Sequence, residues 1–425
     1  MAPSKPNKIL TPDVIAKRGL KILHQQANFI GHITRGYDDR YAKRGAKIGN
    51  TLKIRLPNQF MPRNGTTYSA QAIDERSVSL SITQQAGVDI DITSADLTTS
   101  LDDFSGRILK PAVTQVVAQM ERNCLSMVSE VYSHVVAPGD NFLRHMLACG
   151  ERLDCHLAPR DDRRLGLLAP VDGTRAVEGA RGLYNPASGL SKQFKAGSLG
   201  RTAGLKFFVN THIPQPSGTS DGDNNQHTKA VNFIGGFDEI KAGDDADTST
   251  VTLTTVADFK EGDLFTFPAL PLVHPETKKR LYYPYQGRVT AVDTIAKTVT
   301  FEPKVVGAST GSRDANVADD QLKAKRGNNK HSVKLFRVKA DHVATQSVIF
   351  HPEAFCLATA DLVKPEGVHS VAVEREDGIS MRVVRVYNIQ EDVFHTRIDV
   401  LYGYTVLRPE LAVRLLGAEP MELGS

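Results

Sequence analysis

The chain has 425 residues, of which 40% are hydrophobic and 24% are charged, and its formal net charge is +4. This composition is typical of a globular protein and excludes a disordered or fibrous chain. No apolar run approaches the roughly 20 residues that span a bilayer, which argues against a membrane protein. The N-terminus lacks the apolar core of a signal peptide, so we expect a cytosolic chain with reduced cysteines rather than a disulfide framework.

Basic residues are concentrated at the N-terminal end. Residues 1–50 contain ten Lys and Arg against three Asp and Glu, whereas the remainder contains 42 and 45. A basic end on a near-neutral body indicates contact with nucleic acid or an acidic protein surface, or else a solvated arm. Tryptophan is absent and aromatic residues do not interleave with the basic ones, which argues against sequence-specific recognition of nucleic acid.

The first predicted elements are a helix and an extended arm. The helix begins at Thr11, which can cap it, and Pro12 suits its first turn. Aliphatic residues alternate at 52–56 and again from Ser77 to Thr93, and a long polar segment joins the two runs. We interpret residues 51–93 as a two-stranded arm, which has few large apolar residues and needs another surface to lie on.

Helical periodicity follows from Arg107. Apolar residues at spacings of three and four predict a helix of about 25 residues, ended by Pro138, and a second amphipathic segment follows it. From about residue 230, short strands at regular spacing are separated by Gly, Asp and Pro turns. This pattern predicts a small β-barrel or sandwich inserted into the parent chain, which resumes mixed α/β patterning at Ser347.

Asp89 and Asp91 form a D-x-D pair. Alternate residues of a strand share a face, so the two carboxylates project together and would suit a divalent metal in an enzyme. The neighbouring sequence offers no third ligand, and Ser77, Ser79 and Ser81 repeat the polar alternation without acids. We therefore favour a strand with one polar face over a metal site.

Other candidate sites are equally weak. The nearest approach to a zinc constellation lacks a C-x-x-C pair, and its members do not share one helix face: His145, Cys149, Cys155 and His156. Cys356 has an apolar setting that favours a buried thiol over a nucleophile. The sequence contains no G-x-S-x-G, Walker A, H-E-x-x-H or dinucleotide motif. We therefore expect no catalytic residue, cofactor or metal, and a binding or structural role.

The order of elements resembles that of a known family. It is similar to the coat proteins of short-tailed phages of the Salmonella-phage P-twenty-two type, which share the Hong Kong 97 capsid fold. Matching phrases occur in the same order between residues 183 and 417, a span of more than half of the chain. They are "LYNPASGLSKQFKAGSLGRTAGLKFFVNTHIP" at 183–214, "LVHPETKKRLYYPYQGRVTAV" at 272–292, "FHPEAFCLATADLVKPEGVH" from Phe350 and "EDGISMRVVRVYNIQEDVFHTRIDVLYGYTVLRPELAVRLLG" from Glu376.

The resemblance implies an α+β fold of the Hong Kong 97 type with an inserted small β-barrel domain. It implies six segments: a basic helical N-terminal arm at 1–50; an E-loop at 51–93; a peripheral domain with a long spine helix at 94–160; the first part of an axial domain at 161–229; the inserted β-barrel at 230–335; and the second part of the axial domain, with the return to the peripheral domain, at 336–425.

The resemblance also implies a function. The chain would be a major capsid protein whose hexamers and pentamers close into an icosahedral shell around the double-stranded DNA of a tailed phage. Implied partners are copies of itself, a scaffolding protein, a portal, a cement protein and, non-specifically, the packaged DNA. Its place would be the virion, after assembly in the host bacterial cytoplasm. Alternatives are a metal-dependent enzyme using Asp89 and Asp91, and a minor virion binding module.

Candidate contact residues fall into three groups. Basic residues of the N-terminal arm are candidates for scaffold or DNA contacts: Lys43, Arg44 and Lys47. Asp89 and Asp91 are candidates for contacts between subunits. In the family's prototype an acidic loop of the inserted domain forms salt bridges between capsomers, and the resemblance suggests the same role for Asp244, Asp245 and Asp247.

Overall fold

The computed structural model describes most of the chain. The described residues are 12–35, 51–62, 65–68, 70–71, 73, 75–93, 105–137, 142–180, 201–202, 204–216, 228–233, 241–242, 247–253, 256–257, 259–308, 312–318, 331–336, 344–368, 370–376 and 378–417. The chain divides into two compact units. The first comprises residues 1–56, 77–125 and 355–407, and the second comprises residues 57–76, 126–354 and 408–425.

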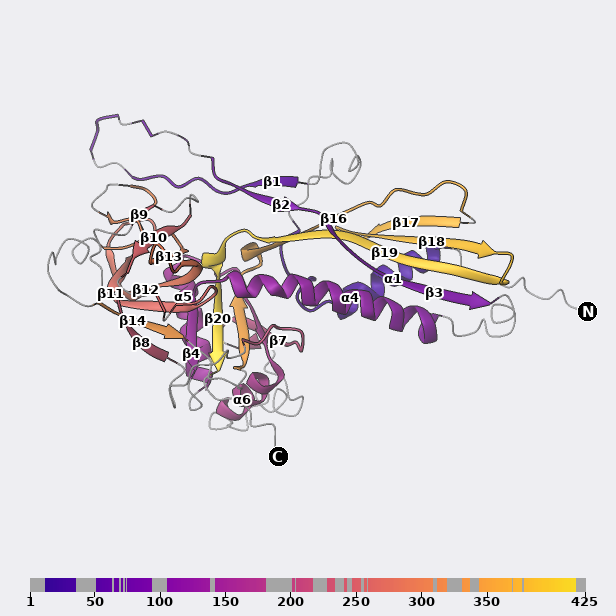
Figure 1. The fold of residues 1–425 in the computed structure, drawn as a ribbon, viewed down its shortest axis with the longest axis horizontal. Coiled ribbons are helices and arrows are strands. Elements are labelled where there is room, and N and C mark those ends of the chain that lie inside the picture. Colours follow the sequence, from indigo (N-terminus) through magenta and orange to yellow (C-terminus); the bar gives the residue numbers. More distant parts are fainter. Residues whose placement is uncertain are drawn as a thin grey trace, which may run out of the picture. The chain divides into compact units, whose positions relative to one another are not determined.

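An antiparallel sheet forms the frame of the first unit (Figure 1). Its central strand is β19 (Val393–Val406), which pairs with β18 (Ile379–Asn388) along one side. Along its other side, β3 (Gln84–Thr93) pairs with the first part of β19 and β16 (Phe355–Ala360) with the last part. β17 (Ser370–Glu376) pairs with β18.

Two helices pack on this sheet, α1 (Pro12–Gln26) and α4 (Lys110–Leu125). Gly19 of α1 lies close to both partners, because a Cβ added there would be 2.9 Å from Met381 Sδ and 3.4 Å from Val113 of α4. The backbone N–H of Phe29 donates to Glu121 Oε1 of α4 at 2.8 Å, which gives a buried carboxylate a partner. Pro12 occupies the first turn of α1, as predicted, whereas the expected cap Thr11 lies outside the described residues.

The predicted long helix is only partly α-helical. A π-turn, η3 (Ser105–Leu109), precedes α4, and a 3-10 turn, η4 (Ser126–Glu130), follows it. The buried apolar residues of α4 have the predicted spacing: Val113, Val116, Val117, Met120 and Cys124. The prediction was wrong at the C-terminal end, because His134–Ala137 form strand β4. Val135 and Val136 are β-branched, which suits the strand as well as it suits a helical repeat.

The predicted arm begins as a two-stranded sheet. β1 (Thr51–Arg55) pairs with β2 (Ser77–Ser81) in antiparallel register, with Thr51 opposite Ser81. Their apolar side chains pack against buried residues of the same unit, among them Ile82, Cys356 and Ala358. The base of the arm therefore rests on its own chain, which supplies the surface that the two strands were expected to need.

The expected single return strand is in fact two strands. β2 ends at Ser81 and β3 begins at Gln84, where pairing passes from β1 to β19. The crossing is close, because a Cβ added at Gly403 of β19 would lie 2.2 Å from the carbonyl oxygen of Ser81. Only glycine permits the two backbones to approach so closely at this point.

The second unit contains a six-stranded sheet in the order β4–β20–β15–β5–β7–β6. Its further strands are β20 (Ala412–Gly417), β15 (Gln346–Phe350), β5 (Leu165–Leu168), β7 (Leu205–Val209) and β6 (Arg201–Thr202). Every residue of β20, β15 and β5 is buried, as expected of strands with both faces covered. Helices α5 (Phe142–Cys155) and α6 (Pro170–Ala180) pack nearby.

A seven-stranded antiparallel sheet completes the second unit. Its order is β8 (Thr228–Phe233), β14 (His331–Phe336), β11 (Leu264–Val273), β12 (Arg280–Asp293), β13 (Thr298–Glu302), β10 (Ser249–Thr252) and β9 (Lys241–Ala242). An aromatic core lies against it, with Phe265 and Phe301 in edge-to-face contact at 5.3 Å.

The expected strands of this segment are present, but the predicted barrel is not closed. β8 and β9 are the end strands, and within the described part of the chain they do not pair with each other. Register shifts in the β11–β12 and β12–β13 pairs bend these long strands around the core without closing the sheet.

Candidate functional site

Asp89 and Asp91 lie side by side on β3, as the alternation predicted, and both face cations on β19. The Asp89 carboxylate accepts from Arg397 Nε at 2.8 Å and from a terminal guanidinium nitrogen at 3.1 Å. His395 Nδ1 donates to Asp91 Oδ1 at 2.6 Å, and this hydrogen bond raises the pKa of His395. The register places each acid directly opposite its partner. The pair is therefore a cross-strand charge ladder.

A buried ion pair extends this ladder. Arg382 of β18 donates to Asp399 Oδ2 of β19 at 2.7 Å, and the Asp399 side chain is only 3% exposed. Arg397 Nε lies 3.7 Å from the other oxygen of Asp399. Cations therefore surround the carboxylates of this face, and no group of three or more His, Cys, Asp or Glu within the described ranges is arranged to hold a metal ion.

The other predicted candidates are scattered. Asp247 is exposed in the turn before β10, whereas Lys43, Arg44, Lys47, Asp244 and Asp245 lie outside the described residues. Cys149 is fully buried in α5, and burial raises the pKa of its thiol. The ring of His156 makes an edge contact with Tyr132 at 6.4 Å. Cys356 is buried in β16 among apolar residues, as expected.

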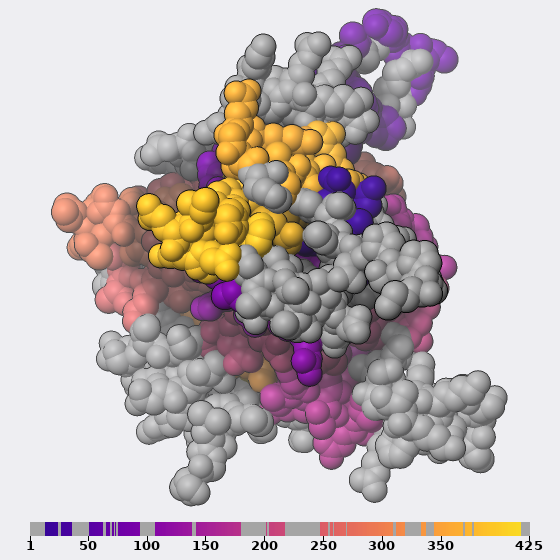
Figure 2. Space-filling model, turned by 90° about the vertical axis from the view of Figure 1, so that its right-hand side faces the viewer, coloured from indigo at the N-terminus to yellow at the C-terminus, as the bar shows by residue number. Residues whose placement is uncertain are grey.

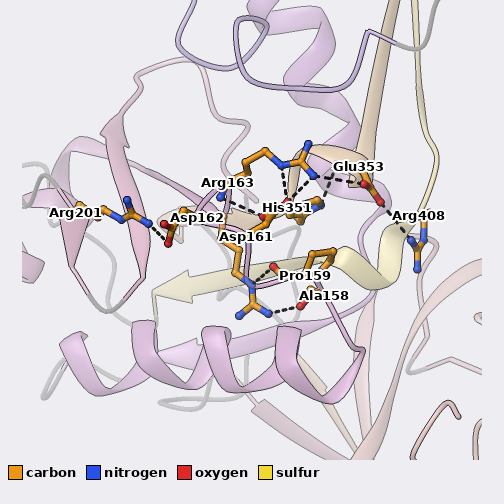
Figure 3. Close-up of polar contacts among 10 residues, drawn as sticks. Ala158, Pro159, Asp161, Asp162, Arg163, Arg201, His351, Glu353 and Arg408 are labelled. Atoms are coloured by element: carbon orange, nitrogen blue, oxygen red, sulfur yellow. Dashed lines mark hydrogen bonds and ion pairs between the residues drawn. The ribbon is translucent and has the colours of Figure 1, made fainter.

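An ionic network surrounds His351 in the second unit, and sequence reasoning missed it (Figure 3). The buried His351 ring lies with Nε2 3.2 Å from one oxygen of Asp161 and 3.3 Å from the other. Asp161 also accepts from Arg163 Nε at 2.5 Å. Desolvation raises the pKa of Asp161, but the hydrogen bonds from Arg163 and His351 outweigh this effect and lower the pKa to about 2. Because Asp161 and His351 are 190 residues apart in the sequence, no local sequence pattern indicates their contact.

The network continues through two 3-10 turns, η8 (Pro352–Ala354) and η9 (Pro409–Leu411). Arg163 lies 3.8 Å from Glu353, and Arg408 lies 3.5 Å from Glu353 and 2.9 Å from Glu410. The second ring nitrogen of His351 is the acceptor for the backbone N–H of Glu353 at 3.4 Å. Both ring nitrogens are therefore occupied by structural partners, so this arrangement ties a loop to two turns and offers no general base.

A cavity of about 500 Å³ lies between the outer face of α5, the loop that follows α5, and the β6–β7 turn. Four of its charged side chains form ion pairs. Asp154 accepts from Arg160 Nε at 2.9 Å and lies 2.8 Å from Arg164, while Asp162 pairs with Arg201. Arg164 also donates to the carbonyl oxygen of Pro159 at 2.8 Å. The fifth charged side chain, Glu151, accepts from the Tyr283 hydroxyl, so each charged group of the lining already has a protein partner.

The 57–76 loop, which joins β1 to β2, exposes apolar side chains. Phe60 is 60% exposed, Tyr68 84% and Ile73 69%. The side-chain amide of Gln71 clamps the loop, because it accepts from the N–H of Met61 at 2.9 Å and donates to the carbonyl of Met61. Arg76 lies 3.3 Å from Asp314 of the same unit. The loop thus presents large apolar groups on a held backbone.

Comparison with known proteins identifies the class of protein to which this chain belongs. The family model described as P22 coat protein - gene protein 5 matches residues 39–417. The protein is therefore a phage coat protein, a structural protein of the virion that builds a shell and is not an enzyme. The chain belongs to the P22 coat protein family. The alternative of a metal-dependent enzyme using Asp89 and Asp91 is thereby wrong, as is that of a minor virion protein.

Three solved structures to which the chain has a low similarity come from two phages and a virus-like particle. A chain from Mycobacterium phage Che8 has a TM-score of 0.45 and 12% identity, over 92% of this chain and 91% of that one. The capsid of cyanophage P-SCSP1u has a TM-score of 0.42 and 11% identity, over 87% and 84%. The virus-like particle from Pyrococcus furiosus has a TM-score of 0.40 and 8% identity, over 94% and 97%. No curated protein matches.

Coat proteins of this family assemble with copies of themselves, so the chain is a subunit of an oligomeric shell. Within the described ranges no helix is long and apolar enough to cross a membrane. The assignment depends on the family match, which spans most of the chain, and on no single catalytic or binding constellation.

Proposed function

We propose that this coat protein closes, as hexamers and pentamers, into an icosahedral shell around double-stranded DNA, and that its 57–76 loop lies on a neighbouring copy. The observation that supports this proposal is the contrast between the loop and its base. The strands β1 and β2 bury their apolar side chains against their own unit, whereas Phe60, Tyr68 and Ile73 remain exposed. Large exposed apolar groups on a held backbone are typical of interface anchors.

A second copy of this chain is the partner that best fits the exposed apolar side chains of the loop. A shell subunit meets copies of itself on every side, and many modest contacts add up to a stable closed assembly. In the terms of the Hong Kong 97 fold, the loop and its strands take the role of the E-loop, α4 that of the spine helix, and the seven-stranded sheet that of the inserted domain.

The triple variant Phe60→Ser, Tyr68→Ser and Ile73→Ser tests the proposed contact. Each side chain is exposed in the single chain, so the subunit should fold with an unchanged circular dichroism spectrum and unchanged thermal midpoint. Its yield of closed particles, measured by sedimentation and negative-stain microscopy, should fall at least tenfold. Tyr282→Ser and Ile295→Ser are matched controls, because both side chains are even more exposed but lie elsewhere, Tyr282 on β12 and Ile295 in the turn between β12 and β13. Normal particle yield from the triple variant would contradict the proposed loop contact.

Finer partners follow from the same proposal. Assembly in the host bacterial cytoplasm would use a scaffolding protein and a portal, and a cement protein would act on the finished shell. The basic arm at 1–50 is the segment suited to a scaffold or to DNA, because its ten Lys and Arg outnumber three acids. Asp247, with Asp244 and Asp245, supplies an acidic segment for salt bridges between capsomers. Asp89 and Asp91 stay candidates for contacts between subunits, since their charge ladder is exposed.

A further inference from the structure

The edge strand β4 of the six-stranded sheet is held by a side chain from the seven-stranded sheet, within the second unit. The backbone N–H of His134 in β4 donates to Gln286 Oε1 at 3.1 Å, and Gln286 Nε2 donates to the carbonyl of His134 at 2.8 Å. The buried amide of Gln286, on β12, thus takes the place of a neighbouring strand. We call this contact, with Thr266 of β11, the β4 seam.

The hydrogen bonds of the β4 seam fit a neutral imidazole. His134 Nδ1 lies 3.0 Å from the carbonyl oxygen of Tyr132, which can only accept, so Nδ1 carries the proton. In the neutral ring Nε2 is then the acceptor for the hydroxyl of Thr266, which lies 3.2 Å away. The same hydroxyl accepts from Gln286 Nε2 at 3.3 Å. Donation runs in one direction, from Gln286 through Thr266 and His134 to Tyr132.

The surroundings of His134 also disfavour its cationic form. Arg414 of β20 lies directly opposite His134 in the strand register, and Arg152 of α5 faces it from the helix. Arg152 donates to the carbonyl of Pro284 at 3.0 Å and lies over the Tyr283 ring. Two further titratable groups lie nearby among the described residues, the buried Tyr132 phenol and the His156 ring that contacts it. Burial first, and then the two guanidinium charges, lower the pKa of His134 to about 3, against a raising effect of the Tyr132 carbonyl.

We propose that His134 makes the β4 seam an acid-sensitive joint, so that acidification loosens the seven-stranded sheet from β4 while both sheets stay folded. A proton that binds Nε2 removes the lone pair that the Thr266 hydroxyl needs and places a third positive charge beside Arg152 and Arg414. An apolar cluster that includes Leu264, Phe336 and Leu416 lies at the same seam and contains no titratable group. This proposal is independent of the contacts proposed for shell assembly.

The direction of the pH effect follows from linkage. A histidine whose pKa is lowered in the closed seam contributes stability that is complete above the ordinary pKa of 6.5 and is lost as the pH falls towards 3. With His134 at its ordinary pKa when the seam is open, the ratio of closed to open seam should fall about 30-fold between pH 7.5 and pH 5.

Hydrogen exchange on the full-length unassembled protein tests the proposal. Protection factors, which remove the intrinsic pH dependence of exchange, are compared at pH 7.5 and pH 5 for the His134 amide, which donates to Gln286, and for amides of β12 and β15, which are paired within their own sheets. In the unaltered protein, protection of the His134 amide should fall about 30-fold while β12 and β15 change little, because both sheets stay folded. Equal changes at all three places, or no change at the His134 amide, would overturn the proposal.

Two variants make the test specific to His134. His134→Gln places an amide oxygen where Nε2 accepts, so it should keep the seam at pH 7.5 and lose the fall in protection at pH 5. Thr266→Val removes the hydroxyl that donates to neutral His134 in the closed seam, so the fall should begin at the same pH but level off at a higher pH. His156→Gln is the matched control, because burial lowers the pKa of His156 to about 4 outside this hydrogen-bond chain. A response of His134→Gln equal to that of the unaltered protein would overturn the proposal.

Discussion

At the scale of single residues, Asp89 and Asp91 obtain their partners from β19, far along the chain. Both carboxylates are largely exposed, and so are Arg397 and His395. Because water screens exposed pairs, we expect Asp89→Asn to lower the free energy of unfolding by less than about 1 kcal/mol, measured by urea denaturation. A loss of several kcal/mol would mean that this ladder is essential to the fold of the subunit.

Asp399 has the same chemistry in a buried setting. Its carboxylate is paired with Arg382, whose side chain is only 15% exposed. Asp399→Asn leaves a guanidinium charge without its counter-ion, and we expect a loss of about 3 kcal/mol in the same denaturation experiment. Asp89→Asn is the matched control, one strand away. Equal losses from the two variants would contradict the distinction between buried and exposed pairs.

Asp161 gives a prediction for acid pH. Its pKa of about 2 lies below the ordinary value of 3.8, so its contribution to stability is complete above the ordinary value and is lost as the pH falls towards 2. We expect Asp161→Asn to remove this part of the pH dependence of the thermal midpoint between pH 4 and pH 2. If the thermal midpoint of the variant falls between pH 4 and pH 2 as much as that of the unaltered protein, then His351 and Arg163 do not stabilise the charged carboxylate of Asp161.

At the scale of elements, the crossing of β2 over β19 depends on Gly403. A methyl group there would overlap the carbonyl of Ser81 and the backbone of Ile82. We expect Gly403→Ala to lower the free energy of unfolding by about 1–3 kcal/mol and to increase hydrogen exchange in β1 and β2.

Gly150 provides the matched control for Gly403. It lies within α5, and a Cβ added there would meet no atom within 4 Å. Gly150→Ala should therefore stabilise the protein by about 0.5–1 kcal/mol, because alanine loses less conformational entropy in a helix. If both substitutions have the same effect, the close approach at Gly403 is not what limits that position.

The elements also show how far local pattern determines structure. The apolar spacing of Val113 to Cys124 predicted α4 correctly, because helix burial is periodic along the chain. The change of partner between β2 and β3 could not be predicted, since the two alternating runs of residues 77–93 keep the same phase and their partners, β1 and β19, come from opposite ends of the sequence. The His351 network was missed for the same reason. Its members come from a loop and two short turns that only the fold brings together (Figure 3).

At the scale of the whole molecule, the family could be inferred from phrases spread over the chain, and the family match confirmed it. The open edges of the seven-stranded sheet could not be inferred, because barrels and open sheets have the same alternation along each strand. Surfaces for neighbours were equally hidden in the sequence. The end of the β18–β19 hairpin, for example, lies at the surface in Figure 2, with Ile389 82% exposed.

The basic arm allows a test on whole particles. We expect Lys43→Glu, Arg44→Glu and Lys47→Glu together to reduce the scaffolding protein or DNA retained in particles several-fold, because like charges then oppose the acidic partner. Gel analysis of purified particles measures both. Lys279→Glu, Arg280→Glu and Lys297→Glu make the same change in net charge on the seven-stranded sheet and should have little effect. Normally filled particles from the first variant would contradict a binding role for the arm.

Cryo-electron microscopy of particles assembled from this protein tests the central claim most directly. The account predicts closed icosahedral shells of hexamers and pentamers in which the 57–76 loop lies on an adjacent copy, with Phe60 and Tyr68 buried at the contact. Protein that stays monomeric under all conditions of assembly, or shells in which both side chains face solvent on their own subunit, would contradict it.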